Sequence, residues 1–506
     1  MARIAMCQDV LMEYMGLMCI SGVLKQAGHT VEVFFDDQRH ETRFIRELQA
    51  FKPDAVLFSV LSPSLEWSLR IGRRVKADVG ALTVYGNVHV ITCPQVIEDE
   101  GVDIVCLGEG EYPMLELCDA IDRGADYSRI EGFWVKTADG IVRNQNRPDL
   151  VDVEVLPFHD REMYDKYGFF RHSRYLRIMA GRGCPFHCSF CTNPVLMDHF
   201  GGKRYVRKRS PQSAIAEIEH TLARHPGTVK FLFFIDEVLW VKNDWLREFF
   251  QLYKERIRLP FTGNFRFGAI TEDDVRLLAE AGATSLVFAT ESGDEVQRRG
   301  LLNKPVSNEQ IIKIAGWLHK YGVSFSASAF FGLPGDTVED HVRRLDFFRT
   351  INPTYLWTTF FQPYPGLALT KQEHVQLHLP KGKQFEVTLH HDMYLDLPDR
   401  ERLINLKKVY FLCAKFPSLT PFLVWLTKLR NPPLFTLLFG LHFSYYIFLF
   451  ERVSLYQFLV HVKNFAINPF LRRKQPMAST GRPYTPPGST PSGGSSALKQ
   501  TVSVGQ

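Results

Sequence analysis

The sequence predicts an α/β protein made of two successive strand–helix series and a helical C-terminal region. Short apolar runs alternate with helix-length segments over about the first 125 residues, and again from about Tyr175 to Gln362. Such alternation is typical of parallel sheets with crossover helices. The chain has 506 residues, of which 45% are hydrophobic and 23% are charged, so we expect a globular protein of two or three domains.

The first series predicts a doubly wound, Rossmann-like domain over residues 1–130. Its first strand is expected at residues 4–7. Apolar side chains at helical spacing over 20–27 then predict a helix that ends at Gly28. The remaining strands are expected at 31–35, 55–59, 82–85 and 103–106. A sheet of this kind binds ligands at the carboxyl ends of its strands.

A linker is expected over residues 131–172. Within it, residues 132–144 predict a β-hairpin, because Asp139-Gly140 is a favoured hairpin turn.

The second series, residues 173–370, predicts a partial (βα)6 barrel of the TIM type. Two helix starts support this interpretation: Ser210 followed by Pro211, and Thr271 ahead of two acidic residues. The six strands are expected at 177–180, 231–235, 261–267, 285–289, 324–331 and 355–362. Barrels of this kind keep their chemistry at the carboxyl ends of the strands.

Residues 371–472 predict a helical, aromatic-rich region. Residues 431–450 include no Lys, Arg, Asp or Glu and are long enough to span a membrane. Pro432-Pro433, the polar His442 and the lack of a basic flank asymmetry argue against a span. We expect a helical substrate region, with peripheral membrane contact through 417–465 as one option. Residues 473–506 are expected to be disordered, being rich in Pro, Gly, Ser and Thr.

The overall charge argues against a nucleic-acid partner. Sixty basic residues nearly balance 55 acidic ones, and the one dense basic run, 203–209, is interpreted as a solvated stretch. Nine cysteines in 506 residues do not form a disulfide scaffold. The N-terminus has no signal-peptide pattern. The expected location is the cytoplasm, or the inner face of the membrane if the C-terminal contact is made.

The most informative motif is the spacing C-x3-C-x2-C formed by Cys184, Cys188 and Cys191. A structural zinc site needs four ligands, usually in two pairs, and no second pair follows. His187 lies between two of the ligands, where its ring is expected to point away. Three thiolates can instead hold an iron–sulfur cluster with one iron left open. We therefore favour a [4Fe-4S] cluster over zinc.

The chain here resembles the radical S-adenosylmethionine (SAM) superfamily. The resemblance lies in the cysteine motif, in Phe190 directly before its last cysteine, and in its position after the first barrel strand. It implies that the open iron binds SAM and that an electron from the cluster releases a 5′-deoxyadenosyl radical. It also implies an enzyme, with Phe190 beside SAM.

Further SAM-binding residues follow from the same resemblance. FFIDE, at the end of the second barrel strand, offers Asp236 and Glu237 to the SAM amino group, although both acids could instead cap the next helix. Arg266 in GNFRFG could pair with the SAM carboxylate, or lie on the solvent side of its strand end.

Two more segments resemble SAM motifs of this superfamily. ATESG, after the fourth strand, offers Glu291 or Ser292 to the ribose. AFFGLPGD resembles the glycine motif of the fifth strand, in which Gly332 and Gly335 lie along the adenine.

The first domain resembles the cobalamin-binding module that is fused to many radical SAM barrels. This resemblance implies cobalamin-binding roles for Ser59 and Leu61 in a serine-x-leucine segment and for Gly86 in a glycine loop. The same role is implied for Gly108 and Glu109 in GEGEYP. Small residues there allow the backbone to approach a ligand closely.

The module departs from the usual pattern at two points. Asn87 stands where a second glycine is usual, and the D-x-H-x-x-G segment that supplies a histidine to cobalt is absent; His40 does not have that spacing. We therefore expect no protein histidine on cobalt. His89 either lines the cobalamin pocket or is a hydrogen-bonded loop histidine.

These resemblances imply a cobalamin-dependent radical SAM enzyme, of the class that includes hopanoid methylases and the anaerobic magnesium-protoporphyrin ester cyclase. The expected reaction is C-methylation of an unactivated carbon by the 5′-deoxyadenosyl radical and methylcobalamin. The apolar C-terminal region suggests an isoprenoid lipid or a tetrapyrrole as substrate. Reduced flavodoxin or ferredoxin is the expected electron donor.

Three alternatives remain at this point. The first is an oxidative or ring-forming enzyme of the cyclase type, and the second is a non-catalytic cobalamin or redox sensor. The third, an RNA methylthiotransferase, is disfavoured because Cys7, Cys19 and Cys93 are scattered and the C-terminal region is apolar.

Overall fold

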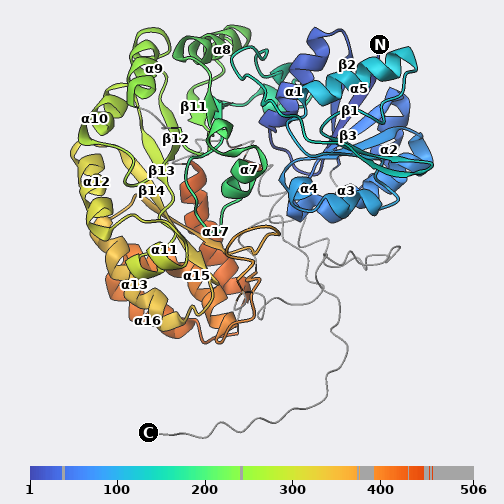
Figure 1. The fold of residues 1–506 in the computed structure, drawn as a ribbon. Coiled ribbons are helices and arrows are strands. Elements are labelled where there is room, and N and C mark those ends of the chain that lie inside the picture. The colour runs from blue at the N-terminus through green and yellow to red at the C-terminus, as the bar shows by residue number, and fades with distance from the viewer. Residues whose placement is uncertain are drawn as a thin grey trace, which may run out of the picture.

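The computed structural model describes residues 1–36, 40–239, 243–372, 375, 392–430, 432–448, 455 and 458–459. Two α/β domains lie side by side, and a helical region packs against the second (Figure 1). The predicted mixed α/β class is thereby confirmed. The predicted disordered tail, 473–506, lies outside the described residues, as does most of 449–472.

The first domain is a doubly wound sheet with strand order β2-β1-β3-β4-β5-β6-β7. The first five strands are parallel. They are β1 (Arg3–Gln8), β2 (Thr30–Phe35), β3 (Ala55–Ser59), β4 (Leu82–Gly86) and β5 (Ile104–Cys106). In such an order the chain reverses direction across the sheet between β1 and β3, where open α/β sheets bind ligands at the strand ends.

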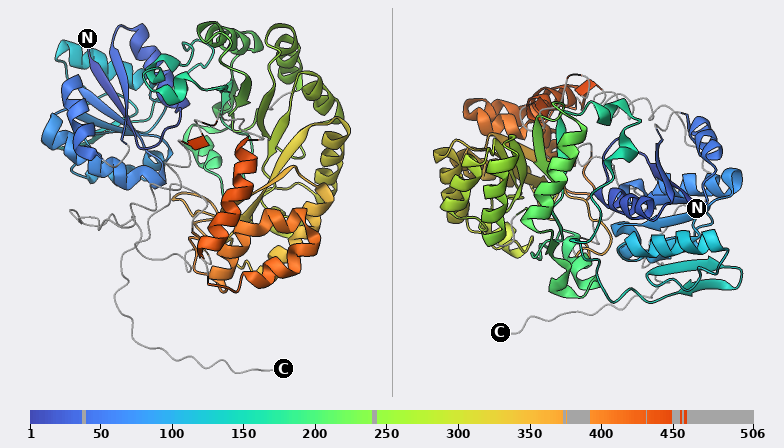
Figure 2. Two further views of the ribbon diagram at one scale, coloured as in Figure 1. Left: turned by 180° about the vertical axis from the view of Figure 1, so that it is seen from behind. Right: turned by 90° about the horizontal axis from the view of Figure 1, so that it is seen from above.

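Helices cover both faces of this sheet (Figure 2). One face carries α1 (Met15–Gln26) and α5 (Glu111–Arg123), and the other carries α2 (Glu41–Phe51) and α3 (Leu65–Arg74). The strands are buried on both sides, which explains why they are nearly continuous apolar runs in the sequence.

The hairpin belongs to the first sheet rather than to a separate linker. Its strands β6 (Phe133–Thr137) and β7 (Gly140–Arg143) continue the sheet antiparallel to β5. Thr137 pairs with Gly140, so the turn residues are Ala138 and Asp139, one position earlier than predicted. Phe133 and Val135 are buried, and their burial fixes this register, because a slip of one residue would expose both.

The second domain is a six-stranded parallel sheet in the order β8-β11-β12-β13-β14-β15, an open barrel with its helices outside (Figure 1). Its strands are β8 (Tyr175–Ile178), β11 (Phe231–Phe234), β12 (Phe261–Phe265), β13 (Ser285–Phe288), β14 (Ser324–Phe331) and β15 (Tyr355–Phe360). All six predicted strands are present.

Two of the outer helices of the barrel, α8 (Pro211–Arg224) and α10 (Glu272–Glu280), begin where the sequence predicts. The others are α9 (Asn243–Arg256), α11 (Glu295–Gly300), α12 (Asn308–Lys320) and α13 (Val338–Ile351). Ser210 caps α8, and Thr271 forms a capping box with Asp274 at the start of α10.

The C-terminal helices cover the open edge of the barrel. They are α15 (Arg400–Lys415), α16 (Thr420–Leu426) and α17 (Pro432–Tyr446). α15 packs on α13 and β15, and α17 packs on α15. Tyr446 of α17 lies 4.7 Å from Tyr355 and 4.6 Å from Trp357 of β15, measured between ring centroids. Among the described residues, no helix combines the length and apolarity needed to cross a bilayer.

Candidate functional site

The cysteine motif lies on a loop between a short strand, β9 (Gly181–Arg182), and α7 (Asn193–His199). Cys184 and Cys188 are buried, and Cys191 is half-buried. Arg266 donates a hydrogen bond from Nη1 to Cys188 Sγ at 3.2 Å, and the Asn193 N–H donates to Cys191 Sγ at 3.5 Å. Donors of this kind tune thiolate ligands of iron–sulfur clusters.

Burial affects the ionisation of two of the three thiols. It raises the pKa of Cys184 to about 11, and the neighbouring Cys188, Cys191 and Glu237 charges add to this effect. The pKa of Cys191 is raised for the same first reason. Cys184 and Cys191 therefore keep their protons at neutral pH unless a metal group displaces them.

Within the described part of the chain, no three His, Cys, Asp or Glu side chains converge on a position for a single metal ion. A cluster needs no such convergence, because each thiolate binds a different iron.

Backbone contacts to the barrel hold the cysteine loop in place. Ser189 Oγ donates to the Leu301 carbonyl at 2.6 Å, and the Ser189 carbonyl accepts from the Leu369 N–H at 2.8 Å. Asn303 donates to the His187 carbonyl, while the His187 side chain is exposed. His187 thus holds the loop through its backbone, as expected for a residue whose ring points away from the ligands.

The two acids after β11 have different surroundings. Asp236 is 2% exposed and accepts hydrogen bonds from the Ala180 N–H at 3.0 Å and Lys208 Nζ at 3.1 Å. Glu237 is accessible to solvent, yet it accepts a hydrogen bond from the Gly183 N–H in the cysteine loop. Burial of its carboxylate among surrounding protein atoms, together with Asp236, raises the pKa of Glu237. Of the two, Glu237 is the one available to a ligand beside Cys184.

Arg266 is buried, with 8% of its surface exposed. The alternative interpretation, an arginine on the solvent side of its strand end, is therefore wrong. The guanidinium carbon of Arg266 lies 3.9 Å from the ring centroid of Phe186, in addition to the contact with Cys188. The cation therefore lies against the cysteine loop, where it can also meet a carboxylate.

Glu291 is close enough to Cys191, the last cysteine of the motif, for its charge to affect that thiol. It adopts a left-handed backbone conformation, with φ of +69°, which is uncommon for a residue other than glycine. Its carboxylate accepts hydrogen bonds from Ser328 Oγ at 2.9 Å and Lys304 Nζ at 3.3 Å, and its charge contributes to the raised pKa of Cys191. Ser292 instead donates to Gln297 at 2.7 Å and faces α11.

The glycine turn after β14 approaches the same region. Gly332 and Gly335 both have left-handed φ angles, of +76° and +78°. A Cβ on Gly332 would lie 2.6 Å from Met393 Cγ, so the C-terminal region packs directly on this turn. Phe330 meets Phe190 edge to face at 5.0 Å. Arg266, Glu237 and Glu291 thus each have a contact with, or a charge effect on, a cysteine of the motif. Asp236 and Ser292 are instead bound by other protein groups.

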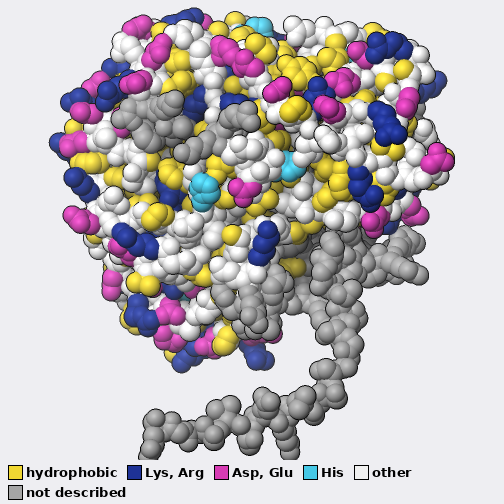
Figure 3. Space-filling view, viewed as in Figure 1, with side chains coloured by type: hydrophobic (Ala, Val, Ile, Leu, Met, Phe, Trp, Pro, Cys, Tyr) yellow, Lys and Arg dark blue, Asp and Glu magenta, His cyan; other side chains and the backbone are white. Residues whose placement is uncertain are grey.

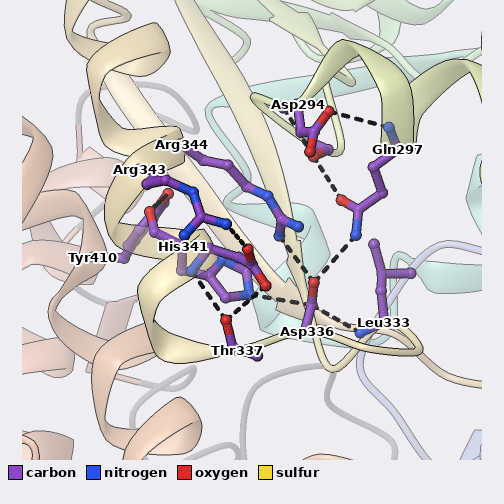
Figure 4. A network of polar contacts seen from close by, with 11 residues as sticks. Asp294, Gln297, Leu333, Asp336, Thr337, His341, Arg343, Arg344 and Tyr410 are labelled. Atoms are coloured by element: carbon purple, nitrogen blue, oxygen red, sulfur yellow. Dashed lines mark hydrogen bonds and ion pairs between the residues drawn. The ribbon is translucent and has the colours of Figure 1, made fainter.

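A buried carboxylate fixes this turn (Figure 4). Asp336 accepts hydrogen bonds from the Leu333 N–H at 3.0 Å, Gln297 Nε2 at 3.2 Å, His341 Nε2 at 3.1 Å and Arg344 Nη1 at 2.9 Å. Because Gln297 also bonds Ser292, Asp336 connects the glycine turn with the loop after β13.

In the first domain, the candidates lie at the carboxyl ends of β3 and β4. Ser59 Oγ accepts a hydrogen bond from Asn87 at 2.9 Å, next to Gly86, and Leu61 begins the following turn. His89 is 2% exposed; its Nδ1 lies 2.9 Å from Ser62 Oγ, and its Nε2 is buried without a hydrogen-bond partner.

The unpartnered Nε2 fits a cobalamin site. Burial lowers the pKa of His89 to about 4, so the ring is neutral at physiological pH. An unsatisfied buried nitrogen is costly and calls for a partner. The histidine therefore presents a polar atom that a bound cobalamin would satisfy.

The segment after β5 lies at the domain boundary. Glu109 accepts hydrogen bonds from Arg182 at 2.7 Å, Arg207 at 2.6 Å and the Val151 N–H at 2.8 Å. Both its oxygens are thus bound by protein groups, which favours a structural role for Glu109 over cobalamin binding. Gly108 lies beside Phe200, which follows α7.

Arg182 connects the two domains next to the cysteine loop. It pairs with Glu109 and with Glu111, which is 2% exposed, and it precedes Cys184 by two positions. We expect Arg182→Gln to lower the free energy of unfolding by about 2 kcal/mol, because it leaves the Glu111 carboxylate buried without its cation. Chemical denaturation and the iron content after reconstitution measure the effect.

The matched control is Arg147→Gln. Arg147 forms a more exposed ion pair with Glu116, and its replacement is expected to cost at most about 0.5 kcal/mol. Equal losses in the two variants would contradict a special role of Arg182 at the domain boundary.

Sequence reasoning missed several residues of this site. Lys304, Ser328 and Arg182 make their contacts with residues 13, 37 and at least 71 positions away. No local pattern marks them. Asp336 could have been identified from the sequence, because an acidic residue directly after the second glycine is typical of a side chain that stabilises a turn.

Two family models match the chain in the order of its domains. The B12 binding domain matches residues 7–118, and the radical SAM superfamily matches residues 178–348.

Curated relatives are distant. The anaerobic magnesium-protoporphyrin IX monomethyl ester cyclase of Rubrivivax gelatinosus is 27% identical over 68% of this chain and 63% of its own length. The chain thus spans less than two thirds of that relative. The hopanoid C-3 methylase of Methylococcus capsulatus is 25% identical over 46% of this chain and 43% of its own length.

A solved structure has a similar fold. The radical SAM methyltransferase TsrM of Kitasatospora setae, solved with tryptophan and a SAM analogue, aligns with a TM-score of 0.60 at 19% identity. The alignment covers 73% of this chain and 76% of TsrM.

Proposed function

The chain belongs to the radical SAM enzymes that carry a B12-binding domain, and on this premise we propose that it is a C-methyltransferase acting on an apolar substrate. Its cofactors are accordingly a [4Fe-4S] cluster, SAM and cobalamin. When bound, they supply a carbon-centred radical and a methyl donor, which together can modify carbons that no protein base could deprotonate.

One geometric relation carries the proposal. α4 (Val88–Thr92), which includes His89, packs against α7, and α7 begins two residues after Cys191. Gly366 lies between these two helices, close to Thr92 and Val195. The ligand edge of the first sheet therefore faces the cysteine loop, an arrangement that lets two cofactors act on one substrate.

Different residues of the chain would bind the different cofactors. Cys184, Cys188 and Cys191 hold the cluster, and Arg266 donates to the sulfur of Cys188. Glu237 accepts from the SAM amino group, which its accessible carboxylate beside Gly183 can reach.

Glu291, held in place by Ser328 and Lys304, would bind the SAM ribose. The turn from Gly332 to Gly335 would contact the adenine. In the first domain, Ser59, Leu61, Gly86 and His89 surround cobalamin, with His89 Nε2 as a polar contact.

The apolar substrate class is supported by the C-terminal helices, which cover the barrel edge with aromatic side chains and approach the glycine turn through Met393. An isoprenoid lipid or a tetrapyrrole fits such surroundings. Oxidative cyclisation is the second candidate, because the Rubrivivax cyclase is among the relatives.

A labelled-methyl assay distinguishes the two reactions. The protein is reconstituted anaerobically with iron, sulfide and cobalamin, reduced with flavodoxin or ferredoxin, and given trideuteromethyl SAM with panels of isoprenoid lipids and tetrapyrrole esters. We expect 5′-deoxyadenosine, S-adenosylhomocysteine and a product that carries one trideuterated methyl group.

Two other outcomes would contradict methylation. A product with a new ring or keto group and no label would indicate a cyclase. SAM left intact by the reduced protein with every panel would indicate a sensor.

A further inference from the structure

Exposed apolar side chains are concentrated in the C-terminal helices. Among the described residues, 16 large hydrophobic side chains are exposed, and five of them are scattered over the first 415 residues. The other eleven lie between 416 and 459. Contiguous exposed apolar area of this kind marks an interaction site in a globular protein.

The spacing of these side chains defines one side of each helix. On α16 and the residues after it, Phe422, Trp425 and Leu429 are 41–56% exposed, while Leu423 is buried. On α17 and its extension, the exposed positions are i, i+4, i+8 and i+11. They are Leu437, Leu441, Tyr445 and Phe448, and we call these four side chains the C-terminal apolar surface.

The other side of α17 is fixed to the protein. Phe435, His442 and Tyr446 are buried, and His442 bonds the Tyr355 hydroxyl at 3.0 Å and the Lys408 carbonyl at 2.9 Å. α17 is thus apolar all round but buried on one side only, which is unusual for a helix in water.

Over its described residues, α17 is too short to cross a bilayer. Its fifteen residues span about 22 Å, against about 30 Å of hydrocarbon. With one side bound to the barrel and the other exposed, this helix is suited to lie along an interface.

The charge of this region indicates the chemistry of the partner. Residues 402–506 contain 13 Lys or Arg and one acidic residue, Glu451, and so carry +12, whereas the whole chain carries +5. The preceding 401 residues therefore carry −7. Arg430 and Lys428, in the short connection between α16 and α17, are exposed, and Arg430 forms an exposed ion pair with Glu401. These two cations next to exposed apolar side chains, in a segment whose sequence has an excess of positive charge, are complementary to an anionic membrane.

A cationic pocket lies at the edge of the same region. It has a volume of about 200 Å³ and is lined by Arg349, Asn352, Lys415 and Pro417 among others, directly beside the exposed Phe416. Lys415 bonds the Asn352 side chain at 2.9 Å.

The face shown in Figure 3 has basic and acidic side chains interspersed over it. Figure 2, left, shows α17 on the opposite side, against the barrel.

We propose that the protein docks on an anionic lipid bilayer through the C-terminal apolar surface. α17 lies in the plane of the interface with its exposed side among the lipids, and Lys428 and Arg430 meet the headgroups. The proposal rests on exposure and charge and not on the methyltransferase assignment. An apolar substrate would, however, reach such an enzyme directly from the membrane.

Vesicle sedimentation tests the proposal with the full-length, cofactor-loaded protein. We expect binding to phosphatidylglycerol–phosphatidylcholine vesicles, with weaker binding to pure phosphatidylcholine and at 1 M salt. Leu437→Gln with Leu441→Gln is expected to weaken partitioning by about tenfold or more, and Lys428→Gln or Arg430→Gln by about fivefold each.

Matched controls keep the result interpretable. Val296→Gln and Ile312→Gln change exposed apolar side chains on the barrel helices and are expected to bind like the unmodified protein. Far-ultraviolet circular dichroism checks that each variant is folded. The assay needs no substrate, so its failure is separate from failure of the proposed reaction.

Two results would overturn the proposal. One is unchanged vesicle binding by the Leu437→Gln, Leu441→Gln variant. The other is a protein that ignores vesicles but forms a dimer that the same variant dissociates, since this would identify the surface as a contact between two copies.

Discussion

Cys184→Ala is expected to prevent cluster assembly and to reduce 5′-deoxyadenosine formation to background. The motif supplies three cysteine thiols, so the loss of one leaves two. Two thiolates cannot retain a cluster that needs three and also leave one iron open. Iron and sulfide content, the visible absorbance and 5′-deoxyadenosine measure the loss.

The matched control is Cys413→Ala. Cys413 is also buried, in α15, and lies far from the motif in sequence. Its replacement removes one sulfur atom from the core and is expected to leave the iron content unchanged. If Cys184→Ala keeps both the cluster absorbance and 5′-deoxyadenosine formation, the assignment of the motif is wrong.

Asp336→Ala is expected to lower the free energy of unfolding by about 3–5 kcal/mol, because it leaves two cationic or polar partners buried without their carboxylate. Those partners are Arg344 and His341, both at most 9% exposed. The Leu333 N–H loses its acceptor as well, so the Gly332–Gly335 turn loosens. We therefore also expect weaker SAM binding, measured by equilibrium dialysis with the reconstituted protein.

Two variants separate these effects. Asp336→Asn keeps the shape and one acceptor oxygen, and it is expected to retain part of the SAM affinity while remaining less stable. Asp340→Ala removes a more exposed acid in the first turn of α13, and it should cost about 1 kcal/mol or less. If Asp336→Ala and Asp340→Ala have the same free energy of unfolding, the buried network does not have the proposed stabilising role.

The pH dependence of stability gives an independent test of the same network. His341 and Arg344 hold the pKa of Asp336 at about 2, below its ordinary 3.8, despite the opposing effect of burial. Because the folded pKa is depressed, the contribution is present above about pH 4 and is lost as the pH falls toward 2. This contribution is about 2 kcal/mol and should be missing from the acid unfolding curve of Asp336→Asn.

Much of the architecture could be predicted because it depends on local patterns. Continuous apolar runs mark strands that are covered on both faces, and Ser210 and Thr271 mark helix starts through hydrogen bonds within three residues. The cysteine motif is equally local, since all three ligands lie within eight consecutive residues. The hairpin turn was misplaced by one residue, because burial of Phe133 and Val135 decides its register.

The site depends on contacts that sequence spacing does not encode. Asp236 and Glu237 are adjacent acids after the same strand. Only the surrounding structure decides that Asp236 binds Lys208 and that Glu237 remains accessible. Glu109 lies in a segment that resembles a cobalamin-binding one, yet its carboxylate forms ion pairs with Arg182 and Arg207. Exposure of one side of α17 likewise depends on how far the barrel edge covers it.

The sequence by itself thus determined the two α/β domains and the family, and it marked Cys184, Cys188 and Cys191 as the candidate cluster ligands, because each of these rests on residues close together in the chain. The tertiary structure alone decided which acids face a ligand, how Asp336 holds the glycine turn, and which apolar side chains remain exposed. The physical reason is that burial, ion pairing and hydrogen bonding depend on which segments, distant in the sequence, pack against each other in the fold.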